Sequence, residues 1–259
     1  MRDPHVERLR YEIGTGEGIS YRDPAPLEFS NKIGRFQLRD GSLLFEPIEH
    51  FSAEEEVRGA VEPFLRGWEM EADLTSNVGT IRFKFLRAEL IDRDPPGPGE
   101  SQVIQLKAAS LVLMAGSVTT HLTCNRYPEP PRAFRTTPEV ELGYRRWLGF
   151  RSGKEPLQSM ESMACFVLTL LASSAGDRNK AGRVFQIEAE VLSTMGQLSS
   201  TRGDGITARK VERVHLFQDL TGTEKQWLEQ AVRRHIHRLG EHASGVPLTM
   251  ITMQELPRL

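Results

Sequence analysis

A short polar segment between two helix-forming stretches holds cations, two carboxylates and an imidazole beside two glycines. Its candidate residues for binding an anionic ligand or a partner protein are Arg202, Asp204, Arg209 and Lys210. Guanidinium and ammonium groups donate several hydrogen bonds to carboxylates and phosphates. The segment therefore predicts a contact surface for an anion or a protein. A solvated surface loop has the same composition, and this simpler interpretation stays open.

The same segment allows a catalytic alternative. The spacing of Arg209 and His215 resembles the Arg-x4–6-His pattern of the HEPN ribonucleases, which are all-helical bundles. The resemblance implies that His215 would act on the ribose 2′-hydroxyl of RNA and that Arg209 would neutralise phosphate charge. Lys210 replaces the asparagine or aspartate that follows the arginine in that family. An endoribonuclease is therefore the alternative function, with nucleic acid as its partner and a homodimer interface as the expected place of its site.

Two further patterns suggest ligand sites but lack the required residues. Residues 149–155 resemble a nucleotide-binding P-loop, but the segment is one residue short and Glu155 replaces the Ser or Thr that would hold magnesium. On a helix, His235 and His237 would lie about 200° apart, so they cannot share a metal ion. His235 and His242 would share one side, but no carboxylate is nominated to join them. We therefore predict no metal site and no cofactor.

The composition is that of an ordinary globular protein, with 39% hydrophobic and 26% charged residues. A net charge of −2 gives no general attraction to nucleic acid or anionic membranes. The two cysteines form no Cys-x-x-Cys motif, and the charged N-terminal residues lack the apolar segment of a signal peptide. The longest nearly apolar stretch, residues 163–172, is about half of a membrane span. These features predict a soluble cytoplasmic protein.

Residues 1–130 are predicted to form a β-rich domain with one covering helix. Short apolar runs separated by turn residues predict strands at 10–13, 32–38, 42–45, 81–86 (continuing towards 91) and 102–123. Asp40-Gly41 predicts a hairpin, and residues 23–26 predict a turn. A helix is expected at about 52–74, with Ser52 as its N-cap, Glu55 at capping-box spacing and a kink at Pro63.

Residues 137–259 are predicted to form an all-α bundle of about four helices, so the fold class is α+β. Thr137 and Pro138 begin a helix that ends near 150. A helix at 155–174 is apolar on nearly all sides, which predicts the central position. A third helix is expected at 178–198, and Thr221 with Glu224 predicts a capping box for a helix to about 243. Residues 248–253 are expected to be extended, as a strand or a strap.

Three stretches, residues 61–69, 153–160 and 202–210, resemble a group of bacterial proteins of unknown role. Some of that group are identified as the methylamine-utilisation accessory protein MauJ. The resemblance implies a bacterial cytoplasmic protein and supplies no mechanism. Because no nucleophile, metal set or cofactor motif is recognised, a non-catalytic binding or accessory protein is the predicted function. Its partner would be a protein or an anionic ligand.

Overall fold

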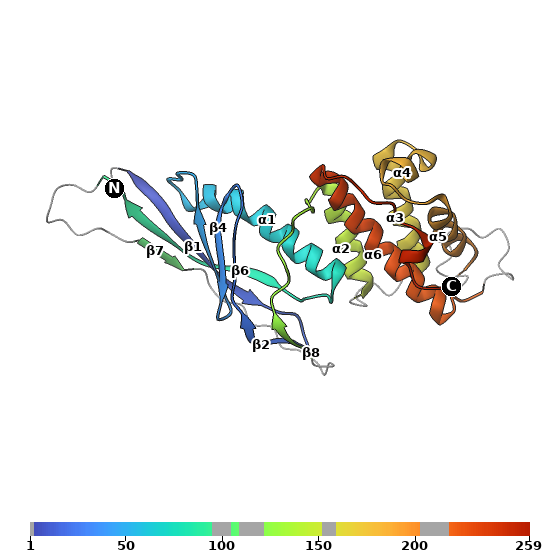
Figure 1. Ribbon diagram of the computed structural model, residues 1–259, viewed down its shortest axis with the longest axis horizontal. Helices are drawn as coiled ribbons and strands as arrows, with labels where there is room; N and C mark the ends of the chain where they lie inside the picture. Colours follow the sequence, from blue (N-terminus) through green and yellow to red (C-terminus); the bar gives the residue numbers. More distant parts are fainter. Residues whose placement is uncertain (1–2, 95–104, 109–121, 152–158, 203–217) are drawn as a thin grey trace. The chain divides into compact units, whose positions relative to one another are not determined.

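The computed structural model describes residues 3–94, 105–108, 122–151, 159–202 and 218–259. The chain divides into two compact units, Met1–Pro131 and Arg132–Leu259. The first unit contains strands and one long helix, and the second contains helices (Figure 1). The α+β class is confirmed, as is the change from strands to helices near residue 130.

A six-stranded antiparallel sheet forms the body of the first unit, with the strand order β3-β4-β5-β1-β6-β7. A separate parallel pair joins β2 to β8. The strands are β1 (Pro4–Gly14), β2 (Ile19–Ala25), β3 (Leu27–Ser30), β4 (Gly34–Arg39), β5 (Ser42–Pro47), β6 (Arg82–Asp92), β7 (Gln105–Ala108) and β8 (Leu122–Arg126). The predicted mainly antiparallel sheet is therefore confirmed.

The predicted Asp-Gly hairpin joins β4 to β5. Asp40 and Gly41 both have positive φ, at 52° and 72°, which is the backbone that a tight type I′ hairpin requires. The turn sets the register, so that Leu38 lies opposite Leu43 and Phe36 lies opposite Phe45. These four side chains are buried, and they form part of the sheet's contribution to the core.

Helix α1 (Glu54–Thr75) packs its apolar stripe against the sheet. The stripe consists of Val57, Val61, Leu65 and Trp68. Three glutamates occupy the first turn, as expected, but the predicted N-cap is wrong. Ala53 occupies the N-cap position without a side-chain hydrogen bond, while the Ser52 hydroxyl donates to Glu56 Oε2 at 3.4 Å. Ser52 therefore lies one residue before the N-cap, and its hydroxyl bonds to a side chain of the first turn instead of to a backbone amide.

The turn predicted at residues 23–26 is wrong, because β2 continues through Asp23 and Pro24 to Ala25. The strand absorbs this segment as an irregularity: Asp23 has a φ of 45°, and the pairing with β8 shifts register between Tyr21 and Ala25. Aspartate tolerates the left-handed conformation, so a single turn-forming residue can sit within a strand. Of the strand predicted at 102–123, residues 102–104 and 109–121 lie outside the described residues.

The second unit contains α2 (Pro138–Arg151), α3 (Met160–Ala175), α4 (Arg178–Val184), α5 (Ala189–Thr201) and α6 (Gly222–Ser244). Helix α3 packs against all four of the others. Met163, Val167 and Leu171 are fully buried, which confirms the predicted central helix. The helix is not apolar on every side, since Thr169 and Ser173 are exposed.

Side-chain caps fix four helix starts among the described residues of this unit. At α4, Asp177 Oδ1 accepts from the Lys180 amide at 2.7 Å. The Thr137 hydroxyl accepts from the Val140 amide at 3.3 Å, and Thr221 forms the predicted capping box with Glu224. Helix α3 begins at Met160 rather than at 155, because Ser159 is extended and its hydroxyl accepts from the Ser162 amide at 3.2 Å. Residues 155–158 of the predicted helix lie outside the described part of the chain.

The helix predicted at 178–198 is wrong as a single element, because the chain breaks between α4 and α5. Gln186 has a φ of 51°, and the buried Ile187 pairs as an isolated parallel bridge with Ile251 of the C-terminal tail. The Ile251 amide donates to Gln186 O at 2.8 Å, and the Glu188 amide donates to Ile251 O at 2.9 Å. The predicted extended tail is confirmed. Its hydrogen bonds replace those that a continuous helix would have made.

Candidate functional site

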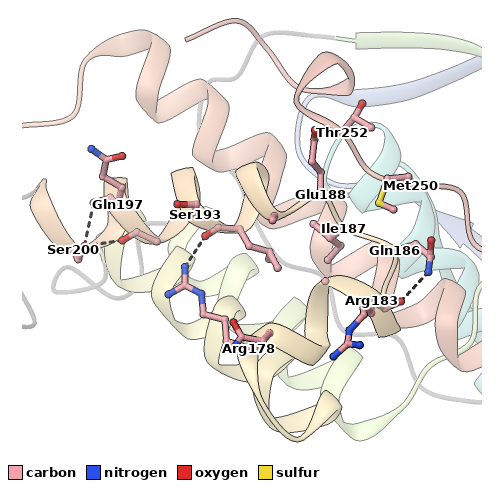
Figure 2. A pocket seen from close by; sticks show the side chains of 15 residues that line it. Arg178, Arg183, Gln186, Ile187, Glu188, Ser193, Gln197, Ser200, Met250 and Thr252 are labelled. Atoms are coloured by element: carbon pink, nitrogen blue, oxygen red, sulfur yellow. Dashed lines mark hydrogen bonds between the residues drawn. The ribbon is translucent and has the colours of Figure 1, made fainter.

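An open cleft of about 970 Å³ lies in the helical unit, lined by α4, α5 and the C-terminal tail (Figure 2). We call it the α4–α5 cleft. Its walls carry amides and hydroxyls, and its apolar lining includes Ile187, Leu192 and Met250. Two arginines, Arg178 and Arg183, line it from α4. The cleft is a product of the helix break, because the residues between α4 and α5 and the paired tail both contribute to its wall.

Arg178 is bound to the backbone of α5, at a position where a glycine leaves room for its guanidinium. Its Nη2 donates to the Leu192 carbonyl oxygen at 2.6 Å (Figure 2). A Cβ on Gly196 would overlap the Arg178 guanidinium, so the absence of a side chain at 196 is what lets the arginine lie there. A guanidinium carries five N–H donors, and Leu192 uses one of them.

The charges in the α4–α5 cleft are not balanced. Among the described residues, neither Arg178 nor Arg183 has a carboxylate within ion-pair distance. Elsewhere in the unit Arg145 pairs with Glu141, Arg151 with Glu229 and Arg202 with Glu224. The one acidic residue of the lining, Glu188, accepts the Met253 amide at Oε2 at 2.9 Å. The cleft therefore carries two guanidinium groups and one carboxylate, and neither guanidinium forms an ion pair with that carboxylate.

Arg202 is the one predicted binding residue that the structure describes, and its side chain is already engaged. Its Nε and Nη2 donate to Glu224 Oε1 at 3.1 and 2.8 Å, and its Nη1 donates to Gln218. Glu224 also accepts the Thr221 amide, and this bond first, then Arg202, lowers the pKa of its carboxyl. Arg202 thus supports the start of α6. Asp204, Arg209, Lys210 and His215 lie outside the described residues, so their predicted roles stay predictions.

The histidines of α6 take part in packing and hydrogen bonding. His237 Nδ1 lies 3.4 Å from Glu241 Oε1, and the His242 ring packs edge-on against Phe185 at a centroid distance of 4.9 Å. His235 is fully buried, and its Nδ1 donates to the Ala231 carbonyl, while its Nε2 has no hydrogen-bond partner among the described residues. Within the described ranges no group of three histidine, cysteine or carboxylate side chains could hold a metal ion.

Acid should destabilise the protein through His235. Burial is the main cause that lowers its pKa to about 4, and the charges of Arg234 and Arg238 act in the same direction. Because the folded pKa lies below the unfolded value of about 6.5, the contribution of neutral His235 is complete above pH 6.5 and is lost as the pH falls towards 4. The expected loss is about 3 kcal/mol. Urea unfolding at pH 7 and pH 4 measures it.

His235→Leu is the informative variant, since it removes the titration and keeps an apolar side chain in the core. Its free energy of unfolding should fall less between pH 7 and pH 4 than that of the wild type. His242→Leu is the matched control, because His242 is exposed on the same helix. Equal pH-dependent losses in the wild type and His235→Leu would contradict the assignment.

A second histidine cluster, which the sequence analysis missed, lies at the start of β1. The Arg93 guanidinium donates to His5 Nε2 at 2.7 Å, and His5 stacks on His50 with a centroid distance of 5.0 Å. His50 lies 3.5 Å from Asp3 Oδ1. Burial, then Arg93, lowers the pKa of His5. Since Nε2 of His5 accepts a hydrogen bond from Arg93, this nitrogen is not available as a base. The cluster therefore connects residues at the ends of neighbouring strands.

The comparisons with known proteins add no relative. The sequence matches no family model, no curated protein and no solved structure. None of the described helices combines the length and apolar character needed to cross a membrane. The resemblances to the MauJ group and to the HEPN ribonucleases therefore stay predictions.

Proposed function

We propose that this chain is a non-catalytic binding protein that contacts a partner protein through the α4–α5 cleft. The observation that carries the proposal is the pair of guanidinium groups, Arg178 and Arg183, that line an open cleft without carboxylate partners among the described residues. Arg202, by contrast, gives its guanidinium to Glu224. Unpaired arginines in a concave surface favour recognition of an external group.

The lining supports recognition rather than catalysis. A serine nucleophile needs an adjacent base. The Ser200 hydroxyl donates to the Gly196 and Gln197 carbonyls, and no histidine is among the residues that line the cleft. Glu188, the one carboxylate, is turned to the Met253 amide. The amides and hydroxyls of Asn179, Gln197 and Ser193 instead suit hydrogen bonding to a polypeptide.

The proposal is tested by placing a photo-crosslinking amino acid at Ser193, which is exposed and lines the cleft. Gln226, exposed on α6 and not among the lining residues, is the matched control position. We expect position 193 to yield a discrete cross-linked protein in the source cells that position 226 does not. The protein is then identified by mass spectrometry, purified and titrated against the wild-type chain.

The decisive step is charge reversal. The purified partner should bind the wild-type chain and should lose binding to the double variant Arg178→Glu, Arg183→Glu, whose circular dichroism should match the wild type. Because both arginines are exposed and unpaired by carboxylates, this change removes no internal ion pair among the described residues; it removes the hydrogen bond from Arg178 to the Leu192 carbonyl. Arg183→Glu alone, which keeps that bond, is the second variant. Unchanged binding, or equal adducts from positions 193 and 226, would show that the cleft is not the contact surface.

A further inference from the structure

We infer that the sheet of the first unit binds a phosphate dianion, as free phosphate or as a phosphate monoester, between Arg10 of β1 and Arg87 of β6. The two residues lie directly opposite each other in the register of these strands. The site lies in a different unit from the α4–α5 cleft, so it does not depend on the proposed function. The inference follows from a pair of like charges that lacks the carboxylates found at the neighbouring position of the same strands.

Arg10 and Arg87 lie on the face of the sheet that points away from α1. Leu9 and Tyr11, which flank Arg10 in the chain, are buried in the core that α1 covers, and so is Ala88, which follows Arg87. Side chains alternate between the two faces along a strand, so both arginines point to the opposite face. Both residues are partly exposed, and the side chain of Arg87 is 39% exposed. A ligand in solution can therefore reach the pair.

The charges of this pair are unfavourable for the sheet alone. Directly opposite side chains in an antiparallel pair have Cβ atoms about 5 Å apart, and like charges there are destabilising. The next strands bring no negative charge to this position, since Leu44 lies opposite Arg10 and Ala108 lies opposite Arg87. Within the described part of the first unit Arg10 has no ion pair, and Arg87 has one long contact, 3.5 Å between Nη2 and Glu89 Oε1.

The neighbouring position of the same strands has the counter-charges that the pair lacks. Arg8, two residues before Arg10 on β1, lies opposite Glu89, and its Nε donates to Glu46 Oε1 at 3.0 Å. One arginine of β1 therefore lies between two carboxylates, while the next arginine on the same face lies beside a second arginine. The register of β1 with β6 also shifts directly after Arg10. Such bulges redirect side chains and are common next to ligand sites.

Unused donors indicate the chemistry of the ligand. Within the described ranges neither guanidinium donates a hydrogen bond, and the Nε of each is buried without a partner. Donors left in this state in a folded protein require an explanation such as a bound ion. A phosphate group has a charge of about −1.5 to −2 at neutral pH and three strong acceptor oxygens, so it can balance both guanidinium groups and accept from each. A carboxylate would balance only one of them.

The test titrates the full chain with inorganic phosphate and with glycerol phosphate, and at equal ionic strength with acetate and dimethyl phosphate, which are singly charged. The arginine Nε–H signals in proton–nitrogen NMR spectra report on the two guanidinium groups directly. We expect inorganic phosphate to shift both signals saturably, with a Kd of about 1 mM or below, and the singly charged anions to bind at least about tenfold more weakly. Tighter binding of glycerol phosphate would identify a monoester as the ligand, and tighter binding of inorganic phosphate would identify the free ion.

Variants of each arginine locate the contact. Arg10→Gln and Arg87→Gln should each weaken the binding of inorganic phosphate by about tenfold. Arg39→Gln is the matched control, because it removes an exposed cation of β4 outside the pair, and it should leave the affinity unchanged. Without phosphate, Arg10→Gln should melt at or above the wild-type temperature, because it removes the repulsion between opposite residues. Saturating phosphate should then raise the melting temperature of the wild type but not that of Arg10→Gln.

Four results would overturn the inference. Inorganic phosphate could give no saturable shift up to about 10 mM, acetate or dimethyl phosphate could bind as tightly, or both glutamine variants could keep the wild-type affinity. A marked fall in the melting temperature of Arg10→Gln without phosphate would show that this arginine stabilises the sheet instead. The cross-link at position 193 lies in the other unit, so these results leave the proposed function unaffected.

Discussion

Leu168→Asp is expected to unfold the helical unit. Leu168 is 7% exposed on α3, the helix that packs against α2, α4, α5 and α6. An unpaired carboxylate in such an interior costs several kcal/mol, and the lost apolar contacts add about 2–3 kcal/mol. The sum is comparable with the whole stability of a typical domain, about 5–15 kcal/mol. Thermal unfolding followed by circular dichroism should show the loss of the helical transition.

The neighbouring residue provides the control for this experiment. Thr169 lies on the exposed side of α3, and its hydroxyl donates only to the Cys165 carbonyl of the preceding turn. Thr169→Asp adds the same charge to the same helix and should leave the melting temperature close to that of the wild type. A wild-type melting temperature for Leu168→Asp would mean that α3 is not the centre of the unit.

The central position of α3 was predictable from the sequence for a physical reason. A central helix must be apolar towards several neighbours, so its composition departs from the simple one-sided pattern of a surface helix. Met163, Val167 and Leu171 carry this signal within the helix itself, and they are fully buried. The Asp40-Gly41 hairpin was predictable for a similar reason, because its left-handed backbone is encoded by two adjacent residues.

The break between α4 and α5 could not be predicted from local sequence. Ala181, Val184, Ile187 and Val191 keep helical spacing across it, so the apolar pattern shows no interruption. The bonds that allow the break come from Ile251, which lies more than sixty residues later in the chain. Gln186 has the positive φ, although glutamine is not a residue type that indicates this backbone conformation. A non-local contact therefore overrides a local helical pattern.

The candidate site was missed for the same reason. Arg178 and Arg183 lie in a segment predicted as one long helix, where exposed arginines look like an ordinary solvated face. Only the break and the returning tail turn that face into the lining of a cleft. Conversely, Arg202 looks free in the sequence, but Glu224 and Gln218, distant in sequence, occupy its guanidinium. Charge clusters in sequence do not reveal which charges are already paired.

The fully buried Arg238 of α6 joins the break to the tail, and this makes it the second critical residue of the unit. Its Nη1 donates to the Phe185 and Thr249 carbonyls, each at 2.7 Å, and its Nε donates to Glu241 Oε2 at 2.7 Å. Burial lowers the pKa of Arg238, with Glu241 acting in the opposite direction. One side chain therefore holds α6, the end of α4 and the tail together.

Arg238→Met is expected to lower the free energy of unfolding by about 3–5 kcal/mol, the usual cost of breaking a buried ion pair by removing one partner. Methionine keeps much of the apolar volume but leaves the Phe185 and Thr249 carbonyls without this donor. Glu241 retains Arg234, so its own desolvation is only partly uncompensated. Urea unfolding of the full chain measures the change, with Lys225→Met as the control for loss of an exposed cation on α6.

Hydrogen exchange distinguishes this role from a general loss of stability. If Arg238 anchors the tail, the amides of Ile251 and Glu188, which pair across the break, should lose protection by more than the amides of α2. A change in unfolding free energy below about 0.5 kcal/mol, the range of ordinary surface substitutions, would show that the buried guanidinium does not hold these three elements together.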